Sequence, residues 1–175
     1  RPPDSADPQR RAAELILQLG GHVYARGPST PVRHLDQLPH PCEITYAWLR
    51  DTDLRDEQVP VITAVPTLWT LNLSLTSLTD HGLHHLSGMK GLRELRLNDT
   101  KVTDEGLAHL VRLNGLELLE LRNTVISDRG LVHVGQLPGL TNLVLVGTPV
   151  SDEGLSHLHG LNRLKEIRLS DTKVT

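Results

Sequence analysis

The chain has 175 residues, of which 38% are hydrophobic and 22% are charged, and these values are typical of a single folded domain. Its net charge of −3 argues against a nucleic-acid partner, and its single cysteine, Cys42, excludes an internal disulfide bond. No apolar run approaches the roughly 18 residues of a membrane-spanning helix, so no membrane contact is predicted for this segment.

The N-terminal part of the chain is predicted to form a tether followed by a helix. Residues 1–7 are proline-rich and polar, which is typical of a tether. Asp7 and Pro8 then favour a helix start, because aspartate accepts bonds from free N–H groups and proline fits the first helical turn. Apolar residues recur at helical spacing until Gly20 and Gly21, which are predicted to end the helix.

Residues 22–25 follow the helix and are predicted to form an edge strand. Residues 26–42 contain four prolines, so they predict an irregular connection with a turn at residues 35–38. No signal peptide is visible, and the chain begins at Arg1 without a methionine and stops inside a repeat. We therefore expect a fragment or a processed form of a longer protein.

From residue 44 onward the sequence repeats with a step of 24 residues. Within one copy, Leu95 and Leu97 alternate with polar residues, which is the pattern of a strand with one buried face. A turn follows, then a Thr-Asp or Ser-Asp pair whose hydroxyl and carboxylate are expected to cap a helix, then leucines at every third residue. Each copy therefore predicts a strand and a short helix. Five full copies begin at Ile44, Leu68, Leu92, Leu116 and Leu140, and half of a sixth begins at Leu164.

A unit of this size cannot cover its own apolar face, so the copies must stack in parallel. A period of about 20 to 29 residues with an L-x-x-L-x-L core predicts a leucine-rich repeat solenoid, an α/β fold with a parallel concave sheet and short helices on the convex side. We expect residues 44–175 to form one folded unit of repeats, and residues 1–43 to supply the tether and a helix-strand cap. A threonine column is expected to satisfy backbone groups in the buried turns: Thr52, Thr76, Thr100, Thr124, Thr148 and Thr172.

These repeats resemble those of bacterial leucine-rich repeat proteins of the ribonuclease-inhibitor-like superfamily, with the pattern L-x-x-L-x-L-x-x-T-x-[VI]-[ST]-D-x-G-L-x-H-L. Residues 99–110 and 147–158 follow it almost letter for letter. The match is close over residues 68–175. It is loose over residues 44–67, where Arg55 and Gln58 replace the hydroxyl residue and the glycine, as an end repeat should. The resemblance implies a binding scaffold and provides no catalytic residue.

Neither a metal site, a cofactor site nor a catalytic site is predicted. Zinc ligands must come within about 2.1 Å of the ion, whereas neighbouring helices stand roughly 10 Å apart. We therefore interpret the histidines of the repeat as structural or solvent-facing, with the i, i+4 pair His81 and His85 left open as a weak chelator. His40 beside Cys42 is interpreted as part of a loop rather than as a base and nucleophile. The repeated histidines are His85, His109, His133 and His157.

The outward face of the strands is the predicted binding surface. Apolar and aromatic side chains stand there at positions where water should favour polar ones. We expect a non-enzymatic module that binds a protein or peptide of unknown identity on this face. The alternative is a structural spacer or self-assembly element of a larger protein. The predicted partner-binding residues are Tyr46, Trp48, Arg50, Arg96, Leu118, Glu120, Arg122, Val144 and Val146.

Overall fold

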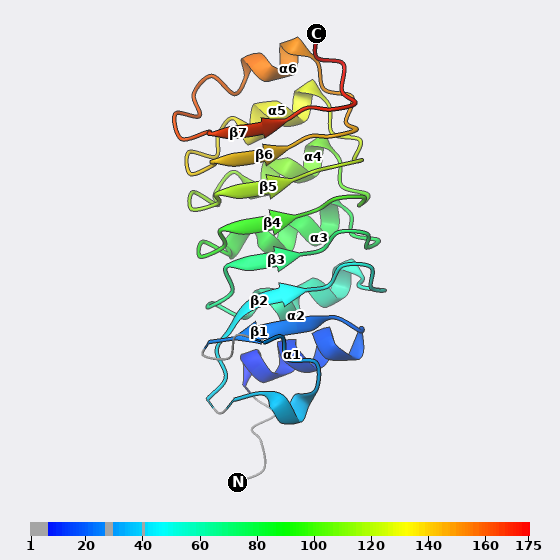
Figure 1. Cartoon of the computed structure of the whole chain (residues 1–175), viewed down its shortest axis with the longest axis vertical. Helices are drawn as coiled ribbons and strands as arrows, with labels where there is room; N and C mark the ends of the chain where they lie inside the picture. Colours follow the sequence, from blue (N-terminus) through cyan, green and yellow to red (C-terminus); the bar gives the residue numbers. More distant parts are fainter. Residues whose placement is uncertain (1–6, 27–29, 40) are drawn as a thin grey trace.

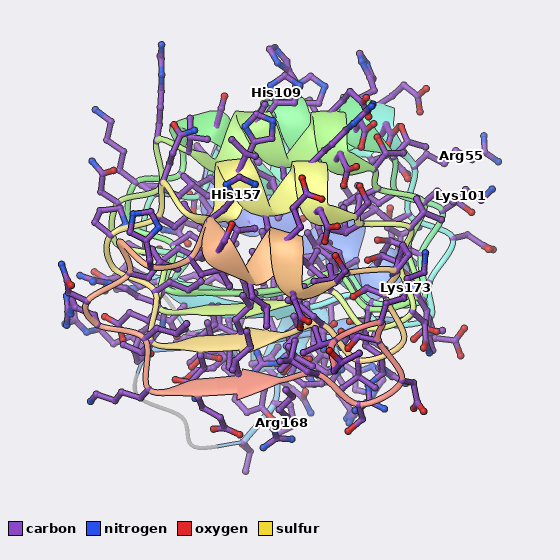
Figure 2. All side chains as sticks on the ribbon, turned by 90° about the horizontal axis from the view of Figure 1, so that it is seen from above. Arg55, Lys101, His109, His157, Arg168 and Lys173 are labelled. Carbon is purple, nitrogen blue, oxygen red and sulfur yellow. The ribbon has the colours of Figure 1, made fainter. Side chains whose placement is uncertain are left out.

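The computed structural model describes residues 7–26, 30–39 and 41–175 (Figure 1). Among these residues seven strands form one sheet, and their order in the sheet follows the chain from β1 to β7. The repeat helices cover one face of this sheet, and the other face is open (Figure 2).

The bounds of the elements agree with one strand and one short helix in each full repeat. The strands are β1 (His22–Ala25), β2 (Ile44–Trp48), β3 (Thr70–Asn72), β4 (Glu94–Arg96), β5 (Leu118–Glu120), β6 (Asn142–Val144) and β7 (Glu166–Arg168). The α-helices are α1 (Pro8–Gln18), α2 (Val59–Thr63), α3 (Asp80–His84), α4 (Asp104–Leu107), α5 (Asp128–Val134) and α6 (Asp152–Ser156). Short 3₁₀ helices are η1 (Leu35–Gln37), η2 (Asp56–Gln58), η3 (His85–Gly88) and η4 (Ala108–Leu110).

Helix α1 and strand β1 lie at one end of the stack (Figure 1). The predicted helix start is confirmed, because the Asp7 carboxylate accepts a hydrogen bond from the Gln9 N–H at 3.0 Å. The predicted edge strand is also confirmed, and it pairs with β2 antiparallel. Helix α1 contacts β1, β2 and α2, but its role as a cap and the boundary at residue 43 stay predictions. Residues 1–6 of the predicted tether lie outside the described residues.

Strands β2 to β7 are parallel and keep the 24-residue step in their register. Ala47 pairs with Leu71 and Leu71 with Leu95, and the series continues through β5 and β6 to Ile167. From Ala47 to Leu143 these side chains are fully buried. Each repeat thus places one leucine-sized side chain in the same slot of a continuous core. The molecule is an α/β leucine-rich repeat solenoid.

The threonine column closes the turn after each strand, as predicted. The Thr100 hydroxyl donates a hydrogen bond to the Leu97 carbonyl oxygen at 2.7 Å. This bond satisfies a carbonyl that would otherwise be buried without a partner. The same bond to the carbonyl three residues earlier is made by Thr52, Thr76, Thr124, Thr148 and Thr172.

The aspartates of the Thr-Asp and Ser-Asp pairs join neighbouring repeats, and the prediction that they cap their own helix is wrong. Asp104 accepts hydrogen bonds from the Ser127 N–H at 2.8 Å and from the Ser127 hydroxyl at 2.6 Å, across one repeat boundary. The hydroxyls of Thr79 and Ser127 do cap their helices. The same inter-repeat bonds link Asp56 to Thr79, Asp80 to Thr103, Asp128 to Ser151 and Asp152 to Thr175.

These carboxylates also explain the glycine of each repeat. A Cβ atom at Gly130 would collide with Oδ1 of Asp104, and the glycines at 82, 106 and 154 meet the aspartate of the preceding repeat in the same way. Val32 stands 24 residues before Asp56, so this step of the repeat provides no aspartate opposite the corresponding position of the first repeat. Gln58 occupies that position, and its side-chain oxygen accepts a hydrogen bond from the Arg55 N–H at 2.9 Å.

Candidate interaction surface

Three columns of side chains, here called the open face, cover the side of the sheet that the helices leave free. Arg168 lies on this side, whereas His109 and His157 lie among the helices on the opposite side (Figure 2). The first two columns are Tyr46, Thr70, Glu94, Leu118, Asn142 and Glu166, then Trp48, Asn72, Arg96, Glu120, Val144 and Arg168. The third column follows the strand ends and comprises Arg50, Ser74, Asn98, Arg122, Val146 and Ser170.

Every tyrosine and tryptophan of the chain gathers at the β1 end of the open face. The Tyr46 ring contacts Tyr24 at 5.6 Å and Trp69 at 5.2 Å between ring centroids. The His22 ring stacks on Trp48 at 5.9 Å, with 21° between the ring planes. We call these five residues the aromatic cluster. Because the sequence contains no phenylalanine, the two tyrosines and two tryptophans of this cluster are all of its Phe, Tyr or Trp residues.

The antiparallel pairing of β1 builds one side of this cluster. It sets His22 opposite Trp48 and Tyr24 opposite Tyr46. Burial, and to a lesser degree the charge of Arg33, lowers the pKa of His22, which favours the neutral imidazole that stacks on Trp48. His22 and Tyr24 were not predicted as site residues, although their alternation with buried Val23 placed them on one face of a predicted strand.

Trp69 is the third member of the cluster, after His22 and Tyr24, that the sequence pattern did not predict. It stands one residue before β3, outside the alternating strand pattern, and its side chain remains 43% exposed. Its contact with the Tyr46 ring brings it onto the edge of the open face. The only signal in the sequence was its residue type, because tryptophan is frequent at interaction surfaces and this chain has only two tryptophans.

Arg96 connects the aromatic cluster to the middle of the sheet. Its guanidinium carbon lies 5.8 Å from the Trp48 ring centroid. Its Nε atom contacts the Glu120 carboxylate at 3.1 Å, and its Nη1 atom contacts the Glu94 carboxylate at 2.9 Å. Strand β3 between these residues is covered, because Asn72 is only 2% exposed. The cluster and Arg96 therefore form a continuous layer over β3.

The other predicted site residues divide by position. Leu118 and Val144 line a shallow hollow of about 90 Å³ on the open face, together with Glu120. Arg50 and Arg122 are exposed, and neither forms an ion pair within the described part of the chain. These positions supply a second apolar contact and two free cationic groups, but their role in binding stays a prediction.

Val146 was predicted to belong to the exposed surface, and this prediction is wrong. Its side chain is only 8% exposed. Strand β6 ends at Val144, and Gly147 takes a left-handed conformation with φ of 72°. Asn98, in the same column, donates a hydrogen bond to Glu120 at 2.6 Å, so the column still lies on the open face and the prediction fails only in the exposure of Val146.

The histidines of the helix side make ring contacts with one another. The centroids of His81 and His85 lie 5.3 Å apart, and those of His84 and His109 lie 4.8 Å apart. Among the described residues, no group of three or more histidine, cysteine, aspartate or glutamate side chains is arranged to hold a metal ion. This side of the molecule therefore supplies no candidate metal centre within those residues.

Cys42 has the environment of a structural thiol. Its side chain is 8% exposed, and burial raises the pKa of its thiol, which disfavours the nucleophilic thiolate. His40, the other member of the pair considered above, lies outside the described residues. None of the helices in the described ranges is both long and apolar enough to span a bilayer.

Comparison with known proteins supports the fold. No protein-family model matches the sequence, and no curated protein matches it. The structure is similar to internalin C2 from Listeria monocytogenes, with a TM-score of 0.53, 23% sequence identity, and coverage of 75% of this chain and 63% of the internalin. A second internalin from the same species, inlF, has a TM-score of 0.47 and 21% identity, and the match covers 67% of this chain and 38% of inlF.

The chain thus spans less than two thirds of the length of either internalin. Both internalins are leucine-rich repeat proteins, and the likeness to internalin C2 agrees with the solenoid described above. The narrower resemblance to the bacterial ribonuclease-inhibitor-like superfamily stays a prediction.

Proposed function

We propose that this chain is a non-enzymatic interaction module that binds a protein or peptide on its open face. The aromatic cluster is the observation that carries the proposal. The core of the solenoid is built from leucine, isoleucine, valine and alanine, with one buried methionine and cysteine, so the aromatic rings are not needed to fill it. Tyrosine, tryptophan and arginine are the residues in which interface energy concentrates.

The layout of the open face suits an extended partner. The aromatic cluster lies at the β1 end, Arg96 and Arg122 lie in the middle, and the hollow beside Val144 lies further along the stack. Solenoids present long surfaces of this kind to proteins and peptides. The partner would contact an apolar anchor point, a charged region and a second apolar point.

The proposal is tested with a partner isolated on the immobilised chain. Trp48→Ala and Arg122→Ala should each weaken binding by about 1 kcal/mol or more, without lowering the melting temperature. His109→Ala, on the helix side, is the matched control and should leave binding intact (Figure 2). Loss of binding in the control, with both open-face variants unaffected, would place the partner on the helices and refute the proposal.

Size-exclusion chromatography with light scattering separates this proposal from a spacer or self-assembly element. An interaction module for another protein should keep the mass of one chain at every concentration. A mass that rises with concentration in the parent chain, but stays at the mass of one chain in Trp48→Ala, would instead show that a second copy binds the open face.

A further inference from the structure

We propose that the segment bound on the open face is an extended acidic peptide, with an apolar or aromatic side chain at the aromatic cluster and a carboxylate about five residues away at Arg122. This inference rests on the proposed function of the open face and specifies the chemistry of its ligand.

The anchor point is the aromatic cluster. Five rings from β1, β2 and the residue before β3 form a connected set of contacts, and the Arg96 guanidinium lies 5.8 Å from the Trp48 ring centroid. Trp69 is 43% exposed, so part of this apolar surface remains in contact with water. An apolar or aromatic side chain of a ligand would displace that water and gain ring contacts.

The charge of the open face favours an acidic ligand. Its three columns contain four arginines and three glutamates, although the whole chain has a net charge of −3. All three glutamates are engaged. Glu94 and Glu120 pair with Arg96, and Glu166 pairs with Arg168. The arginines of the face that form no ion pair with the described residues are Arg50 and Arg122, so the unengaged charge is positive.

Arg122 is the better of these two sites for a carboxylate. The turn residue after Arg50 is Asp51, whose charge opposes binding of an anion there. The turn residue after Arg122 is the neutral Asn123, which adds no negative charge beside the guanidinium and donates a hydrogen bond to Asp99 at 2.9 Å. An arginine side chain can form two parallel hydrogen bonds to a carboxylate.

The geometry of the sheet sets the spacing within the ligand. Trp48 belongs to the β2 repeat and Arg122 follows β5, three strands along the sheet. At about 4.8 Å between strands, the two positions lie about 14 Å apart along the stack. Arg122 also stands two residues beyond Glu120, the register partner of Trp48 on β5, which adds about 7 Å across the stack and makes the separation about 16 Å. An extended peptide advances about 3.3 Å per residue, so about five residues separate its apolar anchor from its carboxylate.

The test is a selection of short random peptides displayed on phage against the intact chain. Enriched peptides should carry an aspartate or glutamate about five residues from an apolar or aromatic residue. Their affinity, measured by fluorescence polarisation, should fall about fivefold or more in Trp48→Ala. In Arg122→Glu it should fall about fivefold to tenfold, because one exposed attraction becomes a repulsion. Arg112→Glu, an exposed arginine near His109 on the helix side, is the charge-matched control.

The outcomes separate this inference from the function on which it rests. Enriched peptides that are basic or uncharged, but still lose affinity in Trp48→Ala, would overturn the acidic ligand and leave the open face as the binding surface. Peptides that bind equally well to both open-face variants would overturn the ligand and the surface together. Failure to enrich any peptide, or self-association abolished by Trp48→Ala, would also refute the acidic ligand.

Discussion

Leu75 occupies a backbone conformation that leucine rarely adopts. Its φ is 59°, in the left-handed region, and the same step of the repeat is left-handed at Asp51, Asp99, Asn123, Gly147 and Asp171. Aspartate, asparagine and glycine tolerate this region, whereas a leucine there costs about 1 to 2 kcal/mol. The Leu75 side chain is 39% exposed, so its burial offsets little of that cost.

Leu75→Asn is therefore expected to raise the free energy of unfolding by about 1 kcal/mol. Urea titration followed by circular dichroism measures this change. The reverse substitution, Asn123→Leu, is the control and should lower stability, since it introduces the same strain and removes the hydrogen bond to Asp99. A Leu75→Asn variant less stable than the parent chain would show that packing of the leucine outweighs its backbone strain.

Two valines near the end of β6 show what the alternation of side chains along a strand can and cannot predict. Val144 and Val146 stand two residues apart, so alternation assigns both to the open face. Val144 is within the strand and follows the rule. Val146 lies in the turn and is buried, as is Ser74 in the corresponding position of the β3 repeat. Alternation assigns a side chain to a face, but its exposure also depends on how closely the neighbouring side chains cover it, and the sequence pattern does not mark that.

At the scale of the elements, the aspartate of one repeat lies close to the glycine of the next repeat, and this contact limits how the neighbouring helices can pack. Gly130→Ala is expected to destabilise the chain by about 1 to 3 kcal/mol, because the added methyl group collides with the Asp104 carboxylate. Gly160→Ala is the matched control, since a Cβ there meets no atom of the described residues within 4 Å. Thermal unfolding of the two variants measures the difference. Equal melting temperatures would mean that the aspartate side chain moves away at little cost.

The same contacts make stability depend on pH. Hydrogen bonds from the Ser151 N–H and hydroxyl lower the pKa of Asp128 in the folded chain. A depressed pKa contributes stability above the pKa of the unfolded chain, and this contribution is lost as pH falls through the folded value. We expect urea midpoints to fall as pH decreases from about 5 to 2, and to fall less steeply in Asp128→Asn. Asp36→Asn, in η1 away from the repeats, should keep the original slope; an unchanged slope in Asp128→Asn would contradict the prediction.

At the scale of the whole molecule, the sequence predicted the solenoid because the repeat constrains both local structure and packing. One period of 24 residues determined the parallel register, the buried leucine slots and the threonine column. The antiparallel direction of β1 was not predicted, since β1 has no second copy in the chain. That pairing brings His22 and Tyr24 to the open face, so the aromatic cluster could be predicted only in part from Tyr46 and Trp48.

Because each repeat contacts only its neighbours, a defect should act according to its position in the stack. Leu119 is fully buried in the middle of the sheet, and Leu119→Asp buries an unpaired carboxylate there, which should unfold most of the array. Ile167 lies on β7 and is only partly buried, so Ile167→Asp should release one repeat and leave amide protection in β2 to β5. Glu117→Ala removes only an exposed pair with Arg93, worth about 0.2 to 1 kcal/mol, and is the control. Hydrogen exchange measures all three variants. Equal loss of protection in the two aspartate variants would show that all repeats unfold together, and that a terminal repeat cannot unfold separately.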